Sequence, residues 1–233
     1  MRSGYTSHLH LRSYLITALI AACVIFTISA PDAAENKREN TGNIEKIIEA
    51  GKVFISNDMH AEAIAEFTKA IAIDPLVSIA YYLRARAYSL AGDFERAITD
   101  FTKAIELNPT YADAYYERGL VYDEHIHDRI KAIDDFTKAL RLRAAFSNAY
   151  FSRGAAFIKY GKYDEAIVDF NAFIRMDRNS GEAYCNRAVA YYYKGEYQKA
   201  WDDIRTSKEL GCEARPAFIR KLELASGKNI SSR

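Results

Sequence analysis

The sequence is poor in residues that interrupt regular structure, with only 4 prolines and 11 glycines among 233 residues. This shortage, with 49% hydrophobic residues, excludes a disordered chain and favours a helical, folded one. Charge of either sign is not in excess, because 32 basic and 31 acidic residues leave a net charge of +1. A near-neutral chain gives no electrostatic basis for binding nucleic acid, so we expect no such partner.

Cysteine is also scarce, and Cys23, Cys185 and Cys212 form no C-x-x-C pair. Zinc-ribbon and thioredoxin-like chemistry are therefore unsupported. The sequence has no Ser–His–Asp arrangement, phosphate-binding glycine loop or H-E-x-x-H motif. We expect neither an enzyme nor a bound cofactor.

Residues 14–30 form an uncharged apolar run of 17 residues, preceded by Arg2 and Arg12. This pattern is typical of an export signal or an N-terminal membrane anchor. Three outcomes stay open: cleavage after the run, retention as an anchor, and lipidation at Cys23. Each places the rest of the chain outside the cytoplasm, because the arginines stay inside. We expect an exported periplasmic or cell-envelope protein that contacts the membrane only through residues 14–30, if they are retained.

The most informative feature is an internal repeat of about 34 residues. Alanine recurs at intervals of 34, 35, 34 and 34 residues, at Ala63, Ala97, Ala132, Ala166 and Ala200. A bulky apolar residue follows at the same spacing, at Phe67, Phe101, Phe136, Phe170 and Ile204. The predicted units are residues 44–77, 78–111, 112–146, 147–180 and 181–214, and the third carries one extra residue near Ile126-His127. A polar linker, residues 31–43, precedes them; a closing helix over 215–226 and a tail, 227–233, follow them.

Each unit is predicted to contain two helices. In the second unit, Tyr81, Ala85 and Tyr88 recur on one helical face. Gly92-Asp93 then breaks the helix, and a second apolar stripe begins at Phe94. Small residues at fixed positions in both helices allow the pair to pack closely.

Tyr, Gly or Ala, Tyr, Ala, Phe, Ala and Pro at these offsets resemble the tetratricopeptide-repeat family, as found in exported bacterial proteins. The resemblance covers residues 44–214 and implies an all-α fold, a right-handed α-solenoid of five helical hairpins with a C-terminal capping helix. The sequence departs from the family at two positions of the repeat. Phe173 and Ser207 stand where the family usually has alanine, and Ala144, Arg178 and Cys212 stand where it often has proline.

An arginine and an aspartate recur together in units two to five and are both missing from unit one. They form the predicted structural pairs Arg84 with Asp100, Arg118 with Asp135, Arg153 with Asp169, and Arg187 with Asp203. We interpret them as ion pairs between the two helices of each hairpin. A row of anion-binding arginines is the alternative.

The resemblance also implies a concave groove, lined by the first helices, that holds a peptide or protein segment. Carried over by position, the partner-binding residues are Lys52, Tyr82, Arg86, Tyr116, Phe151, Asn186, Tyr192 and Tyr193. Aromatic residues and arginine are the types that anchor interfaces. The tyrosines could equally be preferred helix-packing residues. The carboxylate clamp of chaperone-binding family members is not reproduced.

Two further features leave alternatives open. His125 and His127 are weak candidates for a metal site, although a polar turn is the simpler interpretation. Cys185 and Cys212 are expected at the same end of the last hairpin, where they could pair in an oxidising compartment. Family geometry points Cys185 into the groove and Cys212 towards the outer edge, which favours two unpaired thiols over a disulfide. The sequence thus predicts an exported scaffold that binds a protein or peptide. A small-ligand or metal-binding envelope module and a self-associating spacer are the alternatives.

Overall fold

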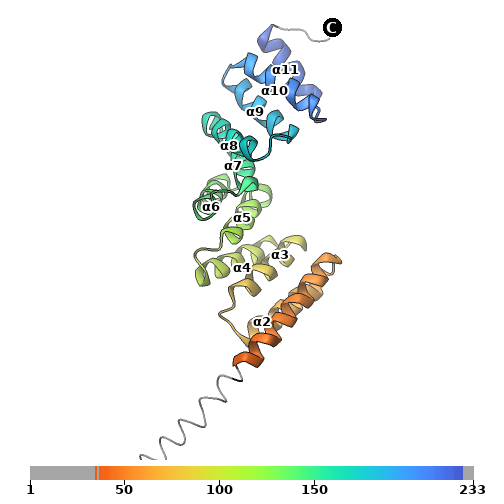
Figure 1. The fold of residues 1–233 in the computed structure, drawn as a ribbon, viewed down its shortest axis with the longest axis vertical. Helices are drawn as coiled ribbons and strands as arrows, with labels where there is room; N and C mark the ends of the chain where they lie inside the picture. The colour runs from red at the N-terminus through yellow and green to blue at the C-terminus, as the bar shows by residue number, and fades with distance from the viewer. Residues whose placement is uncertain (1–34, 36, 228–233) are drawn as a thin grey trace, which may run out of the picture.

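The computed structural model describes residue 35 and residues 37–227, so the predicted export segment lies outside the described part of the chain. Helix pairs follow one another along a single axis, and α2 and α11 lie towards opposite ends of the elongated array (Figure 1). Neighbouring helices in the chain pack against each other throughout. The predicted α-solenoid of helical hairpins is confirmed.

The first helices of the five hairpins are residues 37–56, α3 (Ser78–Leu90), α5 (Ala112–Val121), α7 (Ser147–Tyr160) and α9 (Gly181–Tyr193). The second helices are α2 (His60–Ile73), α4 (Phe94–Leu107), α6 (Arg129–Leu142), α8 (Tyr163–Met176) and α10 (Tyr197–Glu209). A single helix, α11 (Pro216–Ser226), follows the last pair.

The first helix starts earlier than its apolar pattern indicated. Residues 37–43, which we predicted as part of a polar linker, are helical and continue directly into the first unit. Ile44 is the first buried residue of this helix. A solvated helical turn leaves no apolar periodicity, so the repeat pattern could not reveal it.

The core of each of the first four hairpins is a phenylalanine of the second helix placed on a small residue of the first, and Ile204 takes this place in the fifth. Phe101, Phe136 and Phe170 are fully buried. A Cβ atom added to Gly119 would lie 2.8 Å from the Phe136 ring, so the glycine lets the two helices approach this closely. The recurring small residues therefore act through steric fit.

The turn within each hairpin contains one residue with left-handed backbone geometry. Glycine occupies this place at Gly92, Gly161 and Gly195, where φ lies between 76° and 82°. In the third unit the position belongs to His127, with φ of 60°. The extra residue of this unit is accommodated before His127 by a π-helical turn, η1 (Tyr122–Ile126).

The end of the array is covered by α11. Leu222 of this helix is fully buried against Trp201 of α10 and Phe218 of α11. The indole nitrogen of Trp201 donates a hydrogen bond to the Ser226 hydroxyl at 3.0 Å. Among the residues the structure describes, no helix is long and apolar enough to cross a membrane.

Candidate functional site

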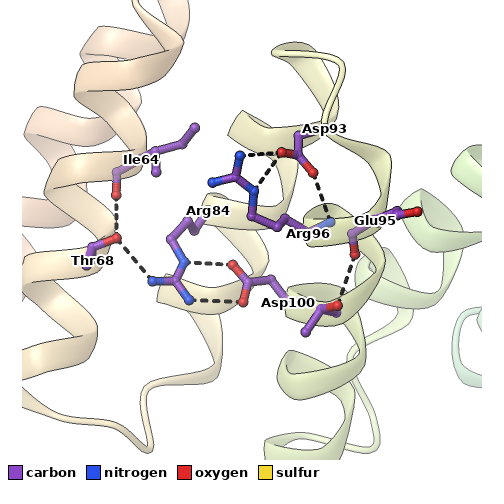
Figure 2. Close-up of polar contacts among 8 residues, drawn as sticks. Ile64, Thr68, Arg84, Asp93, Glu95, Arg96 and Asp100 are labelled. Carbon is purple, nitrogen blue, oxygen red and sulfur yellow. Dashed lines mark hydrogen bonds and ion pairs between the residues drawn. The ribbon is translucent and has the colours of Figure 1, made fainter.

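Arg84 joins three helices that belong to two successive hairpins. Its guanidinium donates two hydrogen bonds to the Asp100 carboxylate on α4, at 2.7 and 3.0 Å. A third bond reaches the Thr68 hydroxyl on α2, in the preceding unit, at 3.1 Å (Figure 2). Hydrogen bonding to Asp100 raises the pKa of Arg84 above its ordinary value. The arginine therefore connects units as well as the two helices of its own hairpin.

The same arrangement recurs in each of the following units. Arg118 bonds Asp135 and Thr102, Arg153 bonds Asp169 and Thr137, and Arg187 bonds Asp203 and Asn171, at distances of 2.5–3.0 Å. The arginine side chains are only 16–17% exposed. This leaves little of each guanidinium for a row of bound anions. Unit one has Ala50 and Glu66 at the equivalent positions.

The first helices meet side by side on one face of the array. Arg86 of α3 lies 3.8 Å from Glu117 of α5. The Tyr116 hydroxyl of α5 lies 3.5 Å from the Ser152 hydroxyl of α7. We call the surface formed by these side chains and their neighbours on α3, α5 and α7 the first-helix face. It contains four of the predicted partner-binding residues: Tyr82, Arg86, Tyr116 and Phe151.

The three aromatic residues of this face are half-buried, because their rings pack within the array. Tyr82 contacts Phe101 and Tyr111, Tyr116 contacts Phe136 and Phe146, and Phe151 contacts Phe170 and Phe173, with ring centroids 4.7–6.0 Å apart. Burial, with a smaller contribution from Glu117, raises the pKa of Tyr82 to about 12. Their recurrence therefore reflects packing, and only part of each ring faces outward.

The charged side chains of the face are partly exposed. Arg86 is 40% exposed and lies over the Tyr82 ring, with its guanidinium carbon 5.9 Å from the ring centroid. Glu117 is 31% exposed, and burial raises its pKa, with Arg86 acting in the opposite direction. The face therefore presents an arginine and a carboxylate side by side, both able to contact a partner.

The remaining predicted residues lie towards the two ends of the array. Lys52, on the first helix of the array, is exposed and bonds Glu49 at 3.2 Å. Asn186 is half-buried on α9. Tyr192 packs edge-on against Phe218 of the closing helix. Tyr193 is 52% exposed and stacks on Tyr163 at 4.9 Å.

The two histidines of unit three are held by contacts of different kinds. The His125 ring stacks on Phe94 of the preceding unit at 3.7 Å. His127 Nδ1 lies 3.3 Å from the Asp123 carbonyl oxygen. No group of three or more His, Cys, Asp and Glu residues suited to a metal ion occurs in the described residues. The geometry thus favours a structural role for both rings.

Sequence periodicity did not reveal a further ion pair beside the first-helix face. Asp123, in the π-helical turn, is buried and accepts a bond from Lys159 of α7 at 2.5 Å. The other carboxylate oxygen of Asp123 is buried with no hydrogen-bond partner in the structure. The pair occurs once and depends on the extra residue of unit three, so no repeat pattern could indicate it.

Comparison with known families identifies the repeat. Sequence models described as TPR repeat or tetratricopeptide repeat match residues 66–99, 85–125 and 153–207. The chain belongs to the tetratricopeptide-repeat family. No curated protein matches this tetratricopeptide-repeat protein in sequence.

Solved structures with the same fold include MamA and YrrB. A crystal structure of MamA is 25% identical, covering 69% of this chain and 94% of MamA, with a TM-score of 0.65. MamA from Desulfovibrio magneticus RS-1 is 18% identical over 72% of this chain and 94% of that one, with a TM-score of 0.67. YrrB, described as a TPR protein with an unusual peptide-binding site, is 22% identical over 81% and 98%, with a TM-score of 0.65.

Proposed function

We propose that this tetratricopeptide-repeat protein is a non-enzymatic scaffold that binds an extended segment of a protein partner across its first-helix face. The observation that carries the proposal is the meeting of α3, α5 and α7 side chains on one face, with Arg86 and Glu117 both accessible. The peptide-binding site named for YrrB, which has the same fold, supports this assignment. The partner segment would pair with the two charges and cover the outward edges of the aromatic rings.

We also propose that the scaffold works outside the cytoplasm, in the periplasm or cell envelope. This part rests on the apolar run at residues 14–30 and on the two preceding arginines. Fractionation of the native host followed by intact-mass analysis tests it. A mature chain in the envelope fraction, either shortened, lipidated or complete, is the expected result. A full-length chain in the cytoplasmic fraction would contradict it.

Photo-crosslinking in the native host tests the binding face. A photoreactive amino acid at position 86 should capture a partner, whereas the same probe at position 96 should not. Arg96 is a matched control because it is an arginine of the neighbouring helix α4 and is 67% exposed. Equal capture at both positions, or no capture at either, would argue against the first-helix face.

Charge reversal gives a second test of the same proposal. Glu117→Lys should reduce partner capture, because it places two cations together and removes the accessible carboxylate. Glu95→Lys on α4 is the control, since Glu95 is exposed on the other helix of the neighbouring hairpin. Circular dichroism of both variants checks that they are folded. Unchanged capture by the Glu117 variant would remove the charge pair from the binding site.

A further inference from the structure

The thiols of Cys185 and Cys212 lie next to each other. Their sulfur atoms are 3.8 Å apart, although the residues are 27 positions apart in the chain. Cys185 is on α9, and Cys212 is in the connection between α10 and α11. The expectation that the two thiols are separated, one towards the groove and the other at the outer edge, is therefore wrong. The connection folds back after Gly211, whose φ is 78°, and this brings Cys212 towards α9.

Unit five has replaced a contact between two rings with a contact between two sulfur atoms. The residue equivalent to Cys185 is Tyr82, Tyr116 or Phe151 in the three preceding units, and its ring contacts, at a tilted or edge-on angle, a ring in the last turn of the second helix or beyond it. In unit five, Cys185 instead contacts Ser207 and Cys212. These are two of the positions at which the sequence departs from the family pattern.

Neighbouring residues are adapted to this contact. A Cβ atom on Gly181 would lie 2.6 Å from the Cys212 Cβ, so only glycine leaves room for Cys212 at this place. The buried Ser207 hydroxyl accepts a hydrogen bond from the Cys185 thiol at 3.2 Å and lies 3.1 Å from the Cys212 carbonyl oxygen. Gly181 and Ser207 together hold the two cysteines side by side.

We propose that Cys185 and Cys212 form a reversible intramolecular disulfide that fastens the last hairpin to the connection leading into α11. Closing the bond requires the sulfur atoms to move from 3.8 Å to about 2 Å apart. Both residues are partly exposed, so a small disulfide reagent can reach them. This inference does not depend on the proposed partner.

The oxidant is a disulfide donor, either a small molecule or a protein. Burial raises the pKa of the Cys185 thiol, which disfavours Cys185 as the first nucleophile. Cys212 is therefore assigned as the attacking residue. Its sulfur attacks the donor disulfide, forms a mixed disulfide and releases one donor thiol. Cys185 then loses its proton, attacks the Cys212 sulfur and releases the second donor thiol. The two electrons lost by the cysteines reduce the donor, which leaves as two thiols.

The bond would act on the end of the array. Cys185 packs with Ala214 and Phe218 in the cluster that surrounds Leu222, the buried anchor of α11. A disulfide at Cys212 holds the start of the connection to α11 against α9. Because it closes a loop of about 28 residues, it restricts the unfolded chain and stabilises the last unit.

Peptide mapping of the full chain tests the proposal. The chain is incubated with oxidised glutathione, its remaining thiols are blocked, and it is digested with trypsin. The expected product is a linked pair of peptides, residues 179–187 and 209–220, which dithiothreitol separates. Peptides that carry glutathione without linkage to each other, or linkage of either one to the Cys23 peptide, would overturn the proposal.

Thermal unfolding supplies an independent measurement. The oxidised chain should melt about 5 °C or more above the reduced chain in the transition that includes the last unit. Cys185→Ser and Cys212→Ser should each abolish this redox-dependent shift, while Cys23→Ser should retain it. A shift that survives in either of the first two variants, or its absence from the linked wild-type chain, would contradict the stabilising role.

Discussion

Replacing Arg153 tests whether the effect of the recurring arginine on stability depends on the burial of its ion pair or on the ion pair alone. Its guanidinium bonds Asp169 twice, at 2.7 Å each, and Thr137 of the preceding unit at 3.0 Å. Arg153→Ala leaves the Asp169 carboxylate, which is only 2% exposed, without its cation. Stranding a buried charge in this way costs roughly 3–5 kcal/mol.

The chain contains a matched surface pair. Arg143 also bonds a carboxylate twice, that of Asp113, at 2.8 and 2.6 Å. These side chains are 46% and 36% exposed, so water screens the interaction. Arg143→Ala should therefore cost no more than about 1 kcal/mol. Both variants remove a bidentate bond to a carboxylate. The pairs differ in burial, and Arg153→Ala also removes the bond to Thr137.

Urea unfolding gives the total loss of stability, and hydrogen exchange of α7 and α8 shows where it occurs. Local exchange is needed because repeat arrays do not always unfold in a single step. The double variant Arg153→Met/Asp169→Leu should recover most of the loss, to within about 1 kcal/mol of the wild type. Burial raises the pKa of Asp169, despite its bond to Arg153, which agrees with a pair that adds little net stability. Equal losses for the Arg153 and Arg143 single variants would refute the reasoning.

Two other variants test packing and charge. Ala166→Leu should destabilise the fourth hairpin by about 1–3 kcal/mol, because Ala166 is fully buried between its helices. Thermal unfolding measures the loss, and Val168→Leu, at an exposed position of the same helix, is the control. Glu117→Gln should alter the pH dependence of stability: burial raises the folded-state pKa, so the wild type loses stability as pH rises from about 4.5 through that pKa. Unfolding curves recorded across pH test this. The stability of the glutamine variant relative to the wild type should increase over this interval and then level off. A stability difference that does not change with pH would show that the pKa of Glu117 is not raised by folding.

Much of the fold could be predicted because the same residue types recur at a regular spacing along the sequence. The interval of 34 residues and the apolar stripe of each unit determined the hairpins. The joint presence of Arg and Asp in four units, and their joint absence from the first, indicated a pair across each hairpin. Such signals depend on contacts that every unit repeats, so a single sequence carries several copies of the same evidence.

The candidate site was less predictable, because the position of a residue in the repeat does not show how much of its side chain packs into the core and how much is exposed in the groove. Tyr116 occupies a groove position of the family, yet much of its ring packs against Phe136 and Phe146. Arg86 and Glu117 meet only because α3 and α5 lie side by side. Comparing positions within one unit could not have paired them.

The sequence alone determined that this protein is an array of helical hairpins, since helix periodicity and repeat spacing are local properties. Only the tertiary structure decided how neighbouring units are joined, including the third hydrogen bond of Arg84 to Thr68 in the preceding hairpin. It also brought Cys185 beside Cys212, against expectation. The physical reason is the same in both cases: these contacts depend on how helices stack and where a connection turns back, and a linear pattern does not encode those distances.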